Sequence, residues 1–255
     1  MKPSQRPIIP VRKYRDYDRS IFINCSFGEE RLKFFVGVHL FATLLGFKPR
    51  SALSDSRERD RLHRIVNVMS RCRFAVHDLT MVTLTEAIAL PRFNMPLETG
   101  LFLGAMEYGD AVQQQKKCLI LTADTQANGG IRLDNHNYVS DLDALDPCTA
   151  DTRDEASWIS SVWLWLLSRR KTLQQPEVDT PVEASQSDAA RALSEFWDEF
   201  LPRYARSLGV DPRSFAPALQ TSSGYPFLMI ATRQFAQTGQ ELWRDSGGHE
   251  RPGQR

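Results

Sequence analysis

Glu98 is the side chain of this sequence best placed to do chemistry. It lies in the segment from Arg92 to Ala105, where Pro96 suits the first turn of a helix. The first turn of a helix favours negative charge by roughly 0.3–1 kcal/mol, so we expect Glu98 to stay ionised unless its pocket is apolar. Such a carboxylate either caps its helix or faces a positive charge that develops in a substrate, and the motif alone leaves both interpretations open.

Asp78 is a second candidate carboxylate. It follows Phe74 to His77, a short apolar run that predicts a buried strand. An aspartate after a strand is commonly a turn residue. Two carboxylates brought to one edge of a sheet by independent elements favour a functional site instead. His77 itself is interpreted either as a packed histidine or as a proton donor next to Asp78.

Two glycines follow Glu98 in the same predicted helix. Gly100 and Gly104 are four residues apart and therefore share one face. Glycine inside a helix costs about 0.5–1 kcal/mol relative to alanine, so a pair of them indicates a steric requirement. We expect the helix to approach the sheet or a ligand closely at these positions.

Short β-rich runs alternate with longer helical patterns through the first two-thirds of the chain. Strands are expected over 21–24, 47–53, 74–77 and 118–121, with Pro49 placing the second at a sheet edge. Helices are expected over 31–45, 57–72, from about 96, and over 154–168, with a loop over 137–145. This alternation predicts an α/β fold with a doubly wound parallel sheet. Ligands bind such sheets outside the carboxyl ends of the strands, which gathers 24–27, Asp78 and the helix beginning near Pro96 at one edge.

The composition divides the chain into five parts. We expect a basic arm (1–19), an α/β domain (20–171), a linker (172–189), a small C-terminal helical region (190–246) and a disordered tail (247–255). Phe196, Trp197 and Phe200 in the helical region would each cost roughly 1.5–3 kcal/mol to leave in water. They must therefore pack on the α/β domain, on a second copy of the chain or on another protein.

Several classes of function are disfavoured. Lys+Arg 32 against Asp+Glu 31 gives a formal net charge of +1, which does not indicate nucleic-acid binding. The four cysteines have no CxxC spacing, so we expect no metal site. The most apolar segment, Trp158 to Leu167, is about half the length that spans a bilayer, and no signal peptide is evident. The expected location is the cytoplasm, without a membrane contact.

Tryptophans and arginines leave alternatives open. Trp158, Trp163 and Trp165 indicate a core or a protein interface rather than a platform for stacked bases, because no basic groove accompanies them. The arginines of the helix over 57–72, which include Arg61, form either a solvated face or a phosphate contact. Glycine-rich phosphate loops of the GxGxxG or GxxxxGK[ST] type are absent from the sequence.

Three segments together resemble a known family. Phe22 to Phe27, Arg73 to Leu79 and Arg92 to Ala105 look like prokaryotic TIR-like proteins, which are related to the nucleoside 2-deoxyribosyltransferases. The resemblance covers about Ile21 to Leu167, and the segment around Glu98 is its most specific part. It implies a flavodoxin-like sheet with an acidic residue beside the carboxyl edge.

The resemblance also implies roles for individual residues. Glu98 would be the catalytic carboxylate in cleavage of the N-glycosidic bond of NAD or a related nucleotide or nucleoside, and Asp78 would orient the base or ribose. The implied substrate-binding residues are Asn24, Ser26, Phe27, Asn94, Met95, Arg50 and Arg61. No cofactor is implied, since the nucleotide is the substrate.

The implied setting is prokaryotic anti-phage defence, with assembly into a homo-oligomer or onto a partner protein through the C-terminal helices. Two other functions remain open: a non-catalytic module that senses a nucleotide in the same pocket, and an interaction domain whose pocket is vestigial.

Overall fold

The computed structural model describes residues 14–54, 60–80, 94–122, 148–150, 154–171, 173 and 185–245. Most of the expected arm (1–19) and linker (172–189) lies outside the described residues, as do the loop expected over 137–145 and the tail (247–255). Within the described part of the chain, no helix combines the length and the apolar character needed to cross a membrane.

A parallel sheet with the strand order β2-β1-β3-β4-β5 forms the centre of the fold. Its strands are β1 (Ser20–Asn24), β2 (Lys48–Arg50), β3 (Phe74–Asp78), β4 (Lys117–Thr122) and β5 (Cys148–Thr149). Pro49 lies in the edge strand β2, as its missing N–H donor predicts. Every residue of β1 and β3 is buried, which is typical of strands covered on both faces.

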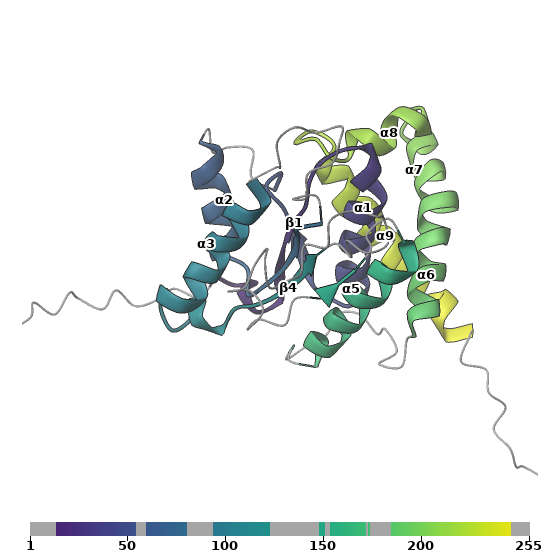
Figure 1. Cartoon of the computed structure of the whole chain (residues 1–255). Helices are drawn as coiled ribbons and strands as arrows, with labels where there is room; N and C mark the ends of the chain where they lie inside the picture. Colours follow the sequence, from purple (N-terminus) through teal and green to yellow (C-terminus); the bar gives the residue numbers. More distant parts are fainter. Residues whose placement is uncertain are drawn as a thin grey trace, which may run out of the picture.

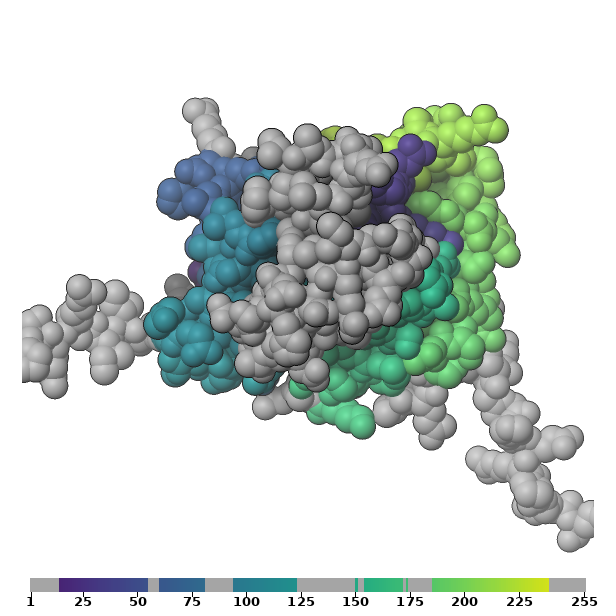
Figure 2. Space-filling model, in the orientation of Figure 1, coloured from purple at the N-terminus to yellow at the C-terminus, as the bar shows by residue number. Residues whose placement is uncertain are grey.

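Helices cover both faces of this sheet, so the predicted doubly wound α/β arrangement is confirmed (Figure 1). One face carries α2 (Arg61–Ser70) and α3 (Asn94–Tyr108), whose side chains pack with Phe22 and Ala75. The other carries α1 (Glu29–Leu44) and α5 (Glu155–Arg170), whose side chains pack with Ile21 and Val76. In the space-filling view, α2 and α3 lie on one side of the molecule and the C-terminal helices on the other (Figure 2).

Helix α1 is buried around most of its circumference because α5 packs against it closely. A Cβ atom at Gly37 would lie 2.5 Å from the Trp158 ring, so glycine is required for this approach. Trp158 and Trp163 are buried and contact Phe41 by their rings. The tryptophans of α5 therefore belong to the core.

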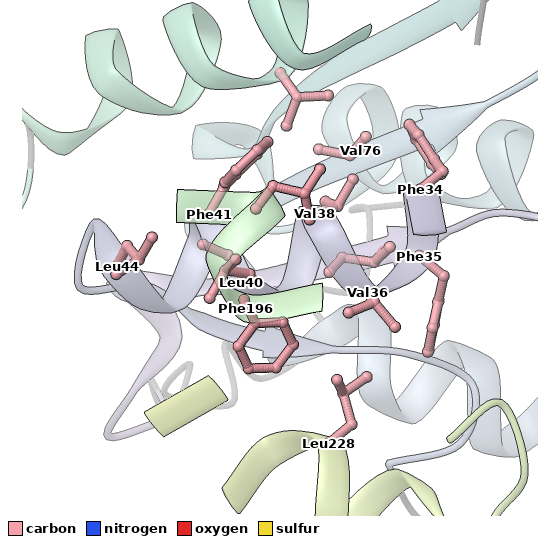
Figure 3. Packing of buried hydrophobic residues seen from close by; sticks show 14 of the residues in the cluster. Phe34, Phe35, Val36, Val38, Leu40, Phe41, Leu44, Val76, Phe196 and Leu228 are labelled. Atoms are coloured by element: carbon pink, nitrogen blue, oxygen red, sulfur yellow. The ribbon is translucent and has the colours of Figure 1, made fainter. Parts of the chain in front are cut away.

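The C-terminal region consists of α6 (Gln186–Ser194), a π-helical segment (Glu195–Phe200), α7 (Leu201–Ser207), α8 (Pro212–Ala218) and α9 (Tyr225–Asp245). A capping box between Ser185 and Asp188 starts α6 inside the range expected to be linker. Phe196 and Leu228 point into the α1 side of the core (Figure 3). These helices share one continuous core with the sheet, so they are not a separate appendage.

The aromatic side chains of this region pack on the α1 side of the core. Phe196 is fully buried, and Trp197 and Phe200 pack against the same core while remaining partly accessible. Phe196 stacks on Phe200 and meets Phe235 of α9 edge-on. Contacts within the chain therefore cover Phe196 fully and Trp197 and Phe200 in part, and a contact with a partner stays a prediction.

Candidate functional site

A cavity of about 320 Å³ lies at the carboxyl end of β1. The chain leaves β1 toward β2 on one side and later returns to β3 on the other, so this is the point where the strand order reverses. Ile23, Cys25 and Ala52 contribute to its walls. The predicted site residues that the structure brings together here are Asn24, Ser26, Phe27, Arg61, Asn94, Met95 and Glu98.

Glu98 projects from α3 onto the cavity wall and is only 6% exposed. It is the fifth residue of α3, which begins at Asn94 rather than near Pro96, so the expectation that Glu98 lies in the first helical turn is wrong. The stabilisation by the helix dipole falls off beyond that turn. Burial raises the pKa of Glu98 to about 7, and the charge of Arg61 opposes this shift. Near neutral pH the group is therefore divided between carboxylate and carboxylic acid.

Asn24 is held at the cavity by two hydrogen bonds that fix its amide. Its Nδ2 donates to the Met95 carbonyl at 3.0 Å and to Nδ1 of His77 at 3.0 Å. His77 is fully buried between Phe22 and Phe102. With both amide hydrogens directed at the protein, Oδ1 of Asn24 is the atom that can accept a hydrogen bond from a ligand.

His77 itself does not line the cavity. Burial, with a smaller contribution from the charge of Lys116, lowers the pKa of His77 to about 3, so the ring is neutral at physiological pH. Because Nδ1 accepts from Asn24, the ring proton sits on Nε2. Of the two interpretations of this residue, the structure favours the packed histidine, with the added task of orienting Asn24.

Asp78 lies apart from the cavity walls and is almost completely buried. Its Oδ1 accepts hydrogen bonds from the backbone N–H and the hydroxyl of Thr80. Its Oδ2 is 3.8 Å from Nε of Arg31, a buried residue of the first turn of α1 whose Nη2 donates to the Thr80 hydroxyl. Asp78 is therefore held by the protein through Oδ1, while its buried Oδ2 accepts no hydrogen bond among the described residues, and its implied role of orienting the substrate stays a prediction.

Sequence reasoning missed Arg31. The available signal was weak, because Arg31 follows Glu29 and Glu30 in the first turn of α1, which starts at the carboxyl edge of the sheet. An arginine is rarely buried without a partner. If Arg31 is buried, an acidic residue at the same edge is therefore its expected partner.

Arg50 is also placed away from Glu98. It lines a different cavity, and its Nε donates to the Ser20 hydroxyl at 3.3 Å. Ala52, two residues further on, does reach the wall of the Glu98 cavity. Arg50, the last residue of β2, therefore faces the other cavity, and the chain reaches the Glu98 cavity two residues later.

Gly100 and Gly104 do not mediate a close approach to the sheet. A Cβ atom added to either would meet nothing within 4 Å. Both line a shallow apolar hollow on the outer face of α3 with Leu97, which is 56% exposed. The expectation that these glycines approach the sheet is wrong, because α3 presents its Phe102 and Glu98 face inward instead, and an approach to a ligand stays a prediction.

Among the described residues, no three histidine, cysteine, aspartate or glutamate side chains gather in a way that could hold a metal ion. Cys25, Cys72 and Cys118 are free thiols. Burial raises the pKa of the Cys25 thiol at the cavity wall well above its ordinary value, which makes it a poor nucleophile.

Comparison with known proteins finds no matching family model, no matching curated protein and no matching solved structure.

Proposed function

We propose that this protein cleaves the N-glycosidic bond of NAD or a closely related nucleotide, with Glu98 as the catalytic carboxylate. The observation that carries the proposal is the burial of Glu98 on the wall of a ligand-sized cavity at the reversal point of the sheet. Asn24 supplies a fixed acceptor and Arg61 a cation on the same wall. These groups suit the ribose hydroxyls and the phosphates of a nucleotide.

The chemistry needs a negative charge near the anomeric carbon. An N-glycosidic bond breaks through an oxocarbenium-like transition state, which a nearby carboxylate stabilises or attacks. In the partly desolvated cavity this interaction is stronger than in water. The pKa of Glu98 near 7 leaves a large carboxylate fraction at neutral pH, and binding a cationic nicotinamide ring would increase that fraction.

The acidic side chains on the cavity wall limit which base can act as the leaving group. Glu98 is the one carboxyl side chain among the described residues that line it. A neutral purine or pyrimidine would need a second group to protonate it, whereas nicotinamide is cationic and leaves without a proton. The cavity therefore favours NAD over a deoxynucleoside as the substrate.

The fold supports the same proposal. The strand order 2-1-3-4-5 is that of flavodoxin-like sheets, in agreement with the resemblance to TIR-like proteins. Within this proposal the protein acts in the cytoplasm of a prokaryote in anti-phage defence, and its activity depends on assembly with further copies or with a partner protein.

The test is incubation of the purified protein with NAD, followed by chromatography for free nicotinamide. Glu98→Gln keeps the size of the side chain and removes the charge. Glu107→Gln, an exposed glutamate on the same helix, is the matched control. We expect release of nicotinamide by the wild type and by Glu107→Gln but not by Glu98→Gln. Equal release by all three proteins would remove Glu98 from the mechanism.

A non-catalytic nucleotide sensor is the second candidate. It is favoured by the same raised pKa, because a carboxyl group that is partly protonated at pH 7 can donate a hydrogen bond to a ligand as well as accept one. Calorimetric binding of NAD without any product after long incubation would support the sensor and contradict the enzyme.

A further inference from the structure

A second cavity, of about 610 Å³, lies between β2, the end of α1 and α9. Helix α9 packs beside α1 on the face of the sheet that carries the C-terminal region (Figure 1). The residues that line this cavity and those that line the Glu98 cavity do not overlap. Its volume is in the range of pockets that hold small molecules.

The walls of this cavity carry more positive than negative charge. Arg19, Lys48, Arg50 and Arg233 line it, against a single carboxylate, Asp16. Asp16 is already paired with Nη2 of Arg19 at 3.1 Å and with Nζ of Lys48 at 3.0 Å. These contacts, led by the hydrogen bond from Lys48, lower the pKa of Asp16 below its ordinary value and keep it ionised. Among the described lining residues, no carboxylate is left to balance Arg50 and Arg233.

The two remaining arginines approach from different elements. Arg50 extends from β2, and its Nε donates to the Ser20 hydroxyl at 3.3 Å, which holds the guanidinium at the cavity wall. Arg233 comes from α9 and is solvent-exposed. An arginine guanidinium presents several N–H donors in a planar fork that matches phosphate oxygens.

The remaining wall is apolar and rigid. Phe47 and Tyr225 are buried there beside Met229. The Tyr225 hydroxyl donates to the Pro49 carbonyl at 3.4 Å and lies 3.2 Å from Nε2 of His39, so its ring is fixed in place. Burial lowers the pKa of His39 to about 4, which leaves the charge of this cavity to its arginines and lysine. Cations next to a fixed apolar wall suit a ligand that joins a ring to phosphate groups.

We propose that this cavity binds a phosphate-bearing small molecule of nucleotide size, with Arg50 and Arg233 contacting its phosphates. The ligand would join α9 to β2 by contacting a side chain from each. It would also touch the segment that leads to the first cavity, because Arg50 and Ser54 line the second cavity while Ala52 lines the first. The inference stands on this cavity alone and does not depend on the activity proposed for Glu98.

The test is isothermal titration of the full-length protein with ADP, with inorganic pyrophosphate and with adenosine. A Glu98→Gln background excludes turnover by the activity proposed for the first cavity. We expect ADP and pyrophosphate to bind and adenosine to bind far more weakly. Arg233→Ala and Arg50→Ala should each weaken ADP binding about tenfold to a hundredfold, because each removes charge-assisted hydrogen bonds. The matched control is Arg213→Ala, an exposed arginine of α8 that does not line the cavity and should bind like the parent.

Arg233 is exposed, so its replacement leaves the core intact, and circular dichroism checks that Arg50→Ala is folded. Failure of ADP and pyrophosphate to bind at millimolar concentration would overturn the proposal. So would ADP binding that is insensitive to both cavity arginines but lost in Arg61→Ala, since the ligand would then occupy the Glu98 cavity.

Discussion

Glu98 and Asp78 are two carboxylates at the same edge of the sheet that the tertiary structure treats in opposite ways. Asp78 receives the N–H and hydroxyl of Thr80 and lies beside the guanidinium of Arg31. Glu98 lies on the wall of a cavity, where burial raises its pKa to about 7. The positive charge of Arg61 opposes this shift. One carboxylate is buried among protein groups, and the other lies on a cavity wall.

The difference teaches that position at a sheet edge is insufficient to identify a reacting group. Both residues satisfy the rule that ligands bind outside the carboxyl ends of parallel strands. Their surroundings separate them, because Asp78 is buried away from the cavity beside Arg31 and Thr80, whereas Glu98 lies on the cavity wall.

The largest expected effect is the loss of stability on replacing Asp78. Asp78→Ala would remove one partner of a buried ion pair, which typically costs about 3–5 kcal/mol. Urea denaturation followed by circular dichroism measures the free energy of unfolding. The exposed pair of Arg203 and Glu199 provides the control, since Glu199→Ala should cost less than about 1 kcal/mol. A stable Asp78→Ala protein without activity would instead place Asp78 in contact with the substrate.

Glu98→Gln tests the other carboxylate. We expect nicotinamide release from NAD to fall at least about a hundredfold, because stabilisation of a transition-state charge is typically worth about 3 kcal/mol. The melting temperature at neutral pH should not fall, because the change removes a buried group whose ionisation is unfavourable in the folded state. A variant that retains full turnover would show that the two carboxylates do not differ in the way inferred here.

The pH dependence of the same two proteins sharpens the comparison. The reaction requires ionised Glu98, so kcat/KM of the wild type should rise with pH through a midpoint near 7. Stability should change in the reverse direction. The folded pKa of about 7 exceeds the ordinary pKa of a glutamate, 4.5, so the native state binds more protons between these values and loses stability as pH rises.

Glu98→Gln removes this linkage. It should therefore be more stable than the wild type at pH 8, by at most about 3 kcal/mol, and similar to it below pH 4. Thermal unfolding of both proteins across this range is the measurement. A wild-type kcat/KM that is flat from pH 5 to 8 would contradict the raised pKa.

The smallest effect is expected on the outer face of α3. Gly104→Ala adds a methyl group to open space and should stabilise the protein by about 0.5–1 kcal/mol without changing activity. Gly37→Ala is the contrasting variant, because its Cβ would lie 2.5 Å from the Trp158 ring. Loss of activity in Gly104→Ala would show that the functional face of α3 is the face that carries Gly104.

Much of the framework could be predicted from local pattern. The alternation of apolar runs and amphipathic stretches predicted β1, β3 and β4 within a residue or two, and the proline in β2 predicted an edge strand. The two-residue strand β5 was not predicted, because a strand that short has no periodicity to detect. The long helix α9 lies within the region expected to be helical, over 190–246.

The sequence by itself determined the parallel sheet and the edge at which a site could form, because strand direction and burial follow from patterns within a few residues. Only the tertiary structure decided that Asp78 pairs with Arg31, that Arg50 faces a second cavity, and that the C-terminal helices close over α1. Each of these depends on contacts between residues far apart in the chain. Such contacts are selected by the packing of the whole core, since a buried charge or aromatic ring can be matched only by whatever the fold brings beside it.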